Sequence, residues 1–251
     1  MKPDLLNYIK TSLNLNEKMI YLLDYKKDDV TGDGIIDKIY LIGNKESPDA
    51  IFAKNITLIV EDGKSGDYIT IPLESNAGYG SRLFTGYFDK DKISDILVSI
   101  DSGGSGGLAF YYIYTIKDQK PVLLFDYEKF NQSFDYEVNY RDFYKVEIIN
   151  KTLNKIFVID ISGKDPEYLS EIYNMDGTLK EPIQGFVVPL GSLWPIVRSK
   201  GDSYDLLAVQ RVIGRFNADT LGYPHTYLTW IDDEFVTTFY TIGLVGEEYY
   251  W

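Results

Sequence analysis

Short apolar runs separated by Gly-, Asn- and Asp-containing segments occupy most of the chain. Apolar or alternating runs of this length are typical of β-strands. Residues 3–12 differ, because their apolar side chains follow helical spacing after a proline, which predicts one short helix. We therefore expect an N-terminal helical segment over 1–18 and a single all-β repeat domain over 19–251. The predicted strands lie at 38–43, 55–60, 68–73, 95–100, 108–116, 145–150, 155–161, 204–213, 225–231 and 235–242.

Four segments share one pattern, a polar Asp or Asn followed by aliphatic and aromatic residues. These anchor positions are Asp37, Asp95, Asn154 and Asp205, separated by 58, 59 and 51 residues. Repeats of about 40–50 residues that hold about four strands each are typical of propeller blades. The spacing predicts a propeller-like fold of about four or five blades. A β-sandwich carrying a calcium loop is the alternative.

Composition narrows the classes of partner. The chain has a net charge of −13 and no cysteine, so disulfides and thiolate metal sites are excluded. Nucleic acid is not an expected partner, because no basic stripe is available to neutralise phosphates. The sequence has no apolar run long enough to predict membrane insertion, and its N-terminal residues lack the apolar core of a signal peptide. A bacterial cell-surface, spore or secreted location is nevertheless favoured.

Residues 29–37, with the sequence DVTGDGIID, carry the clearest chemistry. Carboxylates stand at the first, fifth and ninth positions of this loop, a hydroxyl at the third, and the seventh would offer its backbone carbonyl. Ca²⁺ takes about six to eight oxygen ligands. The loop therefore predicts a Ca²⁺ site, with a metal-free polar turn as the alternative. The predicted ligands are Asp29, Thr31, Asp33, Ile35 and Asp37.

The residues that follow this loop decide between two kinds of calcium motif. An EF-hand requires a bidentate Glu at position twelve. Here that position is Tyr40, and a strand follows instead of a helix. The segment 29–43 as a whole resembles an FG-GAP (VCBS-type) repeat, the calcium-binding repeat of integrin α-chain propellers. This resemblance implies a bacterial, calcium-binding β-propeller module.

Residues 84–101 resemble the same repeat in a degraded form. Position one is Tyr87, and Lys92 replaces the turn glycine. We expect the Lys92 ammonium to pair with a neighbouring carboxylate in place of a metal. The candidate ligands of this degenerate second site are Asp89, Asp91 and Asp95.

A glycine-rich loop follows the second acidic segment. It lacks the Lys-Ser/Thr ending of a phosphate-binding loop. Either it is a flexible hairpin connection or it binds a ligand, because glycines allow close approach and loops often carry function. The candidate ligand-binding residues are Asp101, Ser102, Gly103, Gly104 and Ser105.

Two function hypotheses follow. The first is a non-catalytic module that binds a protein or glycan, or serves in a surface or spore layer, with Ca²⁺ as its cofactor. The second is a carbohydrate-active enzyme that uses paired carboxylates, for which Asp232/Asp233 and Glu247/Glu248 are weak candidates. His225 is the single histidine, and no nucleophile elbow accompanies it, so we assign no catalytic residue.

Overall fold

A computed structural model describes residues 5, 7–9, 11, 19–198, 201 and 203–246. Strands predominate, which confirms the all-β class. Of the predicted N-terminal helix, residues 5, 7–9 and 11 are helical, and the rest of 1–18 lies outside the described residues. The elements are β1 (Ile20–Asp28), β2 (Asp37–Asn44), β3 (Phe52–Glu61), β4 (Tyr68–Pro72), β5 (Gly78–Gly86), β6 (Asp95–Asp101), β7 (Ala109–Lys117), β8 (Lys120–Asp126), α2 (Tyr127–Gln132), β9 (Tyr136–Arg141), β10 (Lys145–Asn150), β11 (Lys155–Asp160), α3 (Pro166–Ile172), β12 (Gln184–Ile196), β13 (Asp205–Ile213), β14 (Thr220–Ile231) and β15 (Glu234–Gly243).

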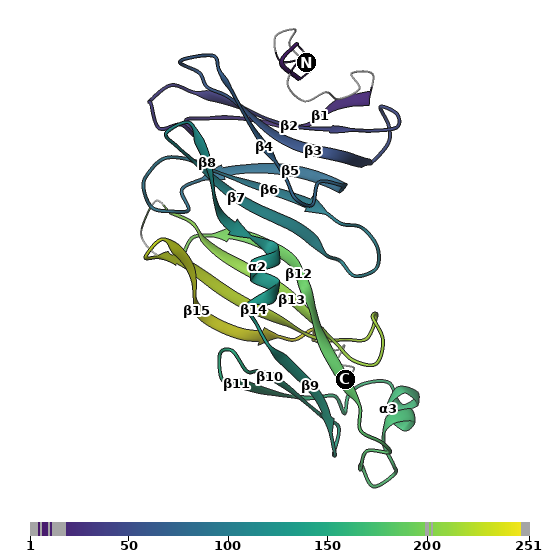
Figure 1. Cartoon of the computed structure of the whole chain (residues 1–251). Coiled ribbons are helices and arrows are strands. Elements are labelled where there is room, and N and C mark those ends of the chain that lie inside the picture. Colours follow the sequence, from purple (N-terminus) through teal and green to yellow (C-terminus); the bar gives the residue numbers. More distant parts are fainter. Residues whose placement is uncertain are drawn as a thin grey trace. The chain divides into compact units, whose positions relative to one another are not determined.

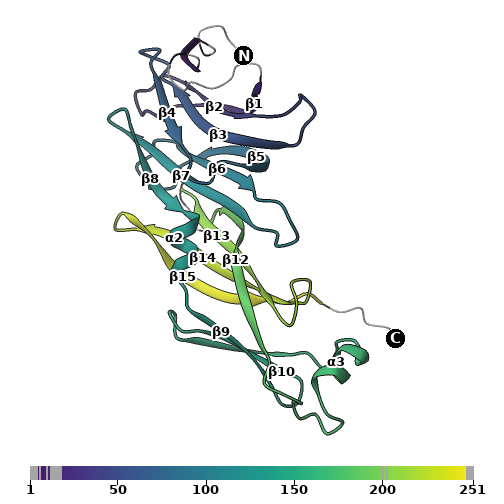
Figure 2. The same ribbon diagram turned by 45° about the vertical axis from the view of Figure 1, so that its right-hand side comes forward.

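The strands form two large sheets (Figures 1 and 2). One follows the order β1-β2-β3-β5-β6-β7-β8, with β4 paired to β3, and the other follows β11-β10-β9-β12-β13-β14-β15. The propeller is not confirmed. Strand β3 pairs with both β4 and β5, so the first four strands continue into the next four instead of closing as a separate blade.

The chain divides into two compact units, which we describe separately. Unit 1 comprises Met1–Tyr127, Pro195–Asp205 and Thr229–Val236. Unit 2 comprises Glu128–Trp194, Leu206–Leu228 and Thr237–Trp251.

Unit 1 contains two similar antiparallel meanders, β1 to β4 and β5 to β8. Lys38 pairs with Glu61 in the first, and Ile96 pairs with Tyr114 in the second. Asp37 and Asp95 precede these pairs by one residue and begin equivalent strands. The predicted repeat therefore holds for its first two anchor positions. The other two, Asn154 and Asp205, border strands β11 and β13 of the second sheet.

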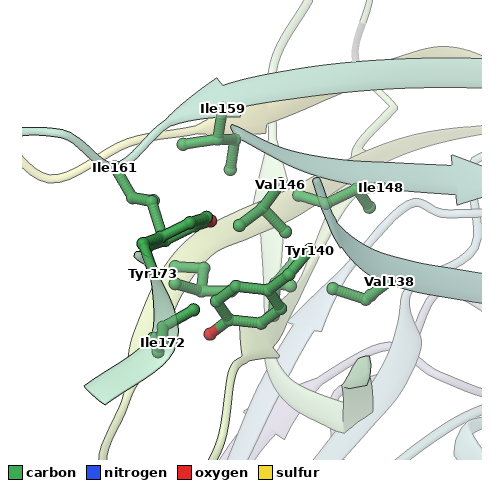
Figure 3. Packing of buried hydrophobic residues seen from close by; sticks show 10 residues of the cluster. Val138, Tyr140, Val146, Ile148, Ile159, Ile161, Ile172 and Tyr173 are labelled. Carbon is green, nitrogen blue, oxygen red and sulfur yellow. The ribbon is translucent and has the colours of Figure 1, made fainter. Parts of the chain in front are cut away.

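Unit 2 is built around a nearly closed, barrel-like sheet. The end strands β11 and β15 approach each other, since the rings of Phe157 and Tyr240 lie 5.6 Å apart. Alternate residues of β9 and β10 point inward, as the two-residue period of a strand requires. Figure 3 shows Tyr140, Ile148 and Tyr173 packing with aliphatic side chains from neighbouring elements in this core.

Candidate functional site

The loop before β2 is closed by a buried carboxylate at its end. Asp37 has no exposed surface. Its Oδ2 accepts backbone N–H groups from Val30 and Thr31, both at 2.9 Å, and its Oδ1 accepts the N–H of Gly63 at 2.8 Å. Buried polar groups need such partners. Asp37 therefore joins both ends of its own loop and also binds the turn between β3 and β4.

The other two carboxylates of this loop also bind its backbone. Asp29 accepts the N–H of Gly32 at 2.8 Å and the N–H of Gly34 at 2.9 Å. These two glycines have φ values of +74° and +83°, a region that side chains with a Cβ rarely adopt. Asp33 accepts the N–H of Ile35 at 2.8 Å, and its Oδ2 lies 3.9 Å from the Nζ of Lys64.

The fit of this loop to Ca²⁺ is partial. Thr31 stands at the third position of the loop, and its buried Oγ1 has no hydrogen-bond partner. This oxygen is therefore available to bind a cation. However, among the described residues no three acidic, histidine or cysteine side chains converge to hold a metal ion. A Ca²⁺ complex would therefore require side-chain rotation. Ca²⁺ binding by Asp29, Thr31, Asp33, Ile35 and Asp37 stays a prediction.

The loop before β6 repeats this geometry. Asp95 is fully buried, and its Oδ2 accepts the N–H groups of Phe88 at 2.8 Å and Asp89 at 3.3 Å. These donors precede Asp95 by the same number of residues as Val30 and Thr31 precede Asp37. Lys90 and Lys92 have φ values of +68° and +69° in the places of the two glycines.

In this second loop an ammonium group lies beside the buried carboxylates. The Nζ of Lys117 lies 3.0 Å from Oδ2 of Asp89, whose side chain is only 2% exposed. The hydrogen bond that Lys117 donates to Asp89 raises the pKa of Lys117, so the ammonium charge is retained. The ammonium beside Asp89 belongs to Lys117 and not to Lys92, the lysine that we expected there. Lys117 is the last residue of β7, and it reaches the loop before β6 only because β6 and β7 pair.

The buried Asp95 carboxyl should make the free energy of unfolding depend on pH. Burial, together with the nearby Asp89 charge and against the hydrogen bond from the Phe88 N–H, raises its pKa to about 7. The unfolded pKa is about 3.9. Folded protein therefore holds a proton that the unfolded chain has released, and stability falls as pH rises from about 4 to about 7. We expect Asp95→Asn to remove this loss, measured by urea unfolding at pH 5 and pH 7. An equal wild-type-minus-variant difference at both pH values would contradict the assignment.

Unit 1 has a cavity of about 330 Å³. Its lining includes Phe52, Tyr79, Lys54 and Asn44. Phe52 and Tyr79 pair across β3 and β5, and their rings meet edge to face with centroids 4.9 Å apart.

The glycine-rich loop packs against the same tyrosine. A Cβ built on Gly103 would lie 2.5 Å from Cε2 of Tyr79, so only glycine fits there, and its φ of +82° also favours glycine. A Cβ on Gly80 would lie 2.8 Å from Oδ2 of Asp101. Of the predicted ligand loop Asp101–Ser105, Gly103 therefore contacts Tyr79, a residue that lines the cavity.

Unit 2 holds a buried polar cluster that sequence reasoning missed. Asp219 has a side chain 2% exposed, and its Oδ1 accepts from Nζ of Lys164 at 2.8 Å. Its Oδ2 accepts from the hydroxyls of Tyr168 at 2.6 Å and Tyr140 at 3.2 Å, and from the N–H of Arg215 at 3.1 Å. We call Asp219, Lys164, Tyr168 and Tyr140 the Asp219 cluster. Asp219 lies 55, 51 and 79 residues from Lys164, Tyr168 and Tyr140, so no local motif could have found the cluster.

The charges of the Asp219 cluster compensate one another. Burial alone would raise the pKa of Asp219, but hydrogen bonds from Lys164 and Tyr168 outweigh this and lower it. Burial and the carboxylate raise the pKa of Tyr168, which therefore remains a hydrogen-bond donor. A Cβ on Gly214 would lie 2.1 Å from both Asp219 Oδ2 and the Tyr140 hydroxyl. The cluster thus connects α3 to the turn between β13 and β14 through an ion pair whose carboxylate is fully hydrogen-bonded within the protein.

The weaker catalytic candidates from the sequence are the single histidine and two pairs of adjacent acids. His225 lies half-buried in β14 beside Gly243, and burial lowers its pKa. Asp232 and Asp233 form the turn between β14 and β15 with φ values of +49° and +64°. Glu247 and Glu248 lie outside the described residues.

These features define a two-unit, all-β protein with duplicated Asp-closed loops. A family model described as the YybI C-terminal domain matches residues 134–243. The uncharacterized protein YybI of Bacillus subtilis (strain 168) is 39% identical over 222 residues, which cover 88% of this chain and 84% of that protein. The chain therefore belongs to the YybI family. No solved structure matches it.

The assignment to FG-GAP (VCBS-type) repeats is wrong, because the family shown by these matches is YybI. The resemblance depended on a nine-residue Asp/Gly loop. Such a loop also forms where carboxylates bind the backbone N–H groups of a tight turn, so the motif does not define one family. Within the described residues, no helix is long and apolar enough to span a membrane.

Proposed function

We propose that the chain is a non-catalytic binding module that holds a protein or glycan ligand in the unit 1 cavity. The observation that carries this proposal is the fixed position of Tyr79 between Phe52 and Gly103. Ligand pockets usually have volumes of about 300–1,000 Å³ and combine aromatic surface with a few polar groups. A ring held on two sides loses little entropy when a ligand packs against it.

The alternative, a carbohydrate-active enzyme, is less well supported. Glycoside hydrolysis uses two carboxyl groups that flank one bond. Three cavities in the described part of the chain each include one acidic residue, respectively Glu46, Glu181 and Asp160. This arrangement favours binding over catalysis.

The binding proposal is tested by saturation-transfer NMR with panels of oligosaccharides and short peptides. We expect at least one class of probe to receive saturation from the wild type and not from Tyr79→Ala. Phe239→Ala is the matched control, because Phe239 is 53% exposed in unit 2 and distant in sequence from the cavity residues. Equal signals from wild type and Tyr79→Ala for every probe would overturn the proposal.

We further propose that Ca²⁺ serves as a structural ion in the Asp29–Asp37 loop. Support comes from three carboxylates in nine residues and from the unpartnered Oγ1 of Thr31. The pairing of Asp33 with Lys64 is long, and the Lys64 side chain is 69% exposed, so an ion could displace it at small cost.

Calcium should raise the midpoint of thermal unfolding. An ion at a hundredfold excess over its Kd stabilises the native state by about 2.7 kcal/mol. We expect the Ca²⁺-dependent rise to be lost in Asp33→Ala and kept in Asp91→Ala, the equivalent change in the second loop. Calorimetry with Ca²⁺ and with chelator measures both. Wild-type unfolding curves that superimpose with Ca²⁺ and with chelator would contradict the proposal. The loop would then be stabilised by hydrogen bonds between its carboxylates and its own backbone N–H groups, without a metal.

A further inference from the structure

We infer that the ligand of the unit 1 cavity is an acidic saccharide, a pyranose ring bearing a carboxylate. This inference rests on the proposed binding function and assigns its ligand class. It draws on three properties of the cavity: its size, its aromatic wall and the sign of its local charge.

The size and wall favour a single sugar ring. A volume of about 330 Å³ lies at the lower end of the range for ligand pockets. Phe52 and Tyr79 both line this volume, and their rings lie next to each other, so aromatic surface is available to a ligand. The apolar face of a pyranose matches such a surface, while its hydroxyls need polar partners, which Asn44 and Lys45 provide.

The local charge is opposite in sign to that of the whole chain. The chain carries −13, yet the cavity lining contains Lys45 and Lys54 against a single acid, Glu46. Lys45 Nζ donates to the carbonyl of Pro48 at 2.7 Å and is therefore held in place. Two ammonium groups beside one carboxylate leave the lining net positive, which suits an anion.

Lys54 is the group best placed to receive the ligand carboxylate. Its Nζ lies 5.9 Å from the centre of the Phe52 ring and 4.0 Å from Oε1 of Glu46. The Lys54 side chain is 61% exposed and that of Glu46 is 86% exposed, so their pairing is weak. A carboxylate on a bound sugar can replace Glu46 as the partner of Lys54 without breaking a buried interaction.

The test compares oligomers of glucuronate and galacturonate with uncharged oligomers of glucose and galactose, by calorimetric titration of the full chain. We expect the acidic sugars to bind more tightly than the neutral ones. Lys54→Gln should weaken the acidic sugars by about three- to fivefold, the scale of one exposed ion pair, and leave neutral sugars unchanged. At 1 M salt this difference should shrink, because the Debye length falls to about 3 Å. Lys120→Gln, an exposed lysine of β8, is the control.

Failures of the two claims are distinguishable. Binding of a saccharide that Tyr79→Ala abolishes, but that is equal for acidic and neutral sugars or insensitive to Lys54→Gln, overturns the acidic ligand and keeps the binding module. Absence of any saccharide binding also overturns the acidic ligand, and the peptide panel then decides the binding function.

Discussion

Asp219→Ala is expected to destabilise unit 2 by about 3–5 kcal/mol, the usual cost of removing one partner of a buried ion pair. The substitution removes the carboxylate that accepts from Lys164, Tyr168 and Tyr140. Lys164 then keeps only the Thr220 carbonyl, at 3.3 Å, and the two hydroxyls keep only each other, at 2.8 Å. It also removes the acceptor of the Arg215 N–H. Urea unfolding followed by near-ultraviolet circular dichroism measures the effect, because tyrosines of the cluster report on unit 2.

Two companion variants separate the causes. Asp219→Asn keeps the size of the side chain but removes the charge, so it should recover part of the loss. Glu167→Ala, in the first turn of the same helix α3, should change the free energy of unfolding by no more than about 0.5 kcal/mol, since Glu167 is exposed. An Asp219→Ala effect as small as that of Glu167→Ala would mean that the cluster does not stabilise the unit.

Asp37→Ala should strongly destabilise unit 1. It leaves the N–H groups of Val30, Thr31 and Gly63 without an acceptor, two of them in a loop whose end is fully buried. The Val30 hydrogen bond is buried and the other two are part-buried, so at about 1–3 kcal/mol for each buried unsatisfied group we expect a loss of about 2–3 kcal/mol in chelator. Chelator matters because it removes any contribution from Ca²⁺.

Asp33→Ala is the matched control for this prediction. Asp33 accepts a single exposed N–H, from Ile35, and pairs only loosely with Lys64. Without Ca²⁺ its loss should cost less than about 1 kcal/mol. If Asp33→Ala and Asp37→Ala destabilised the chelated protein equally, the loop would not depend on the buried carboxylate.

Local pattern was sufficient for the elements that depend on near neighbours. Alternating apolar residues predict most of the strands, because the period of two is a property of the backbone. The two acidic loops were also visible, since Asp29, Asp33 and Asp37 bind N–H groups within their own nine residues. The equivalence of Asp37 and Asp95 followed from the same pattern. The same local pattern occurs in unrelated families and so does not identify the family of the chain. The FG-GAP assignment was wrong for that reason.

The tertiary structure decided everything that joins distant segments. The arrangement of strands into two sheets depends on pairings such as β3 with β5 and β9 with β12, which carry no sequence signature. Lys117 reaches Asp89, Gly103 reaches Tyr79 and Lys164 reaches Asp219 only after those strands have paired. The sequence by itself determined the all-β class and the Asp-closed loops, because hydrogen bonds within a loop and the strand period are local. The cavity and the Asp219 cluster are nonlocal, since their members meet only through the packing of the whole sheet.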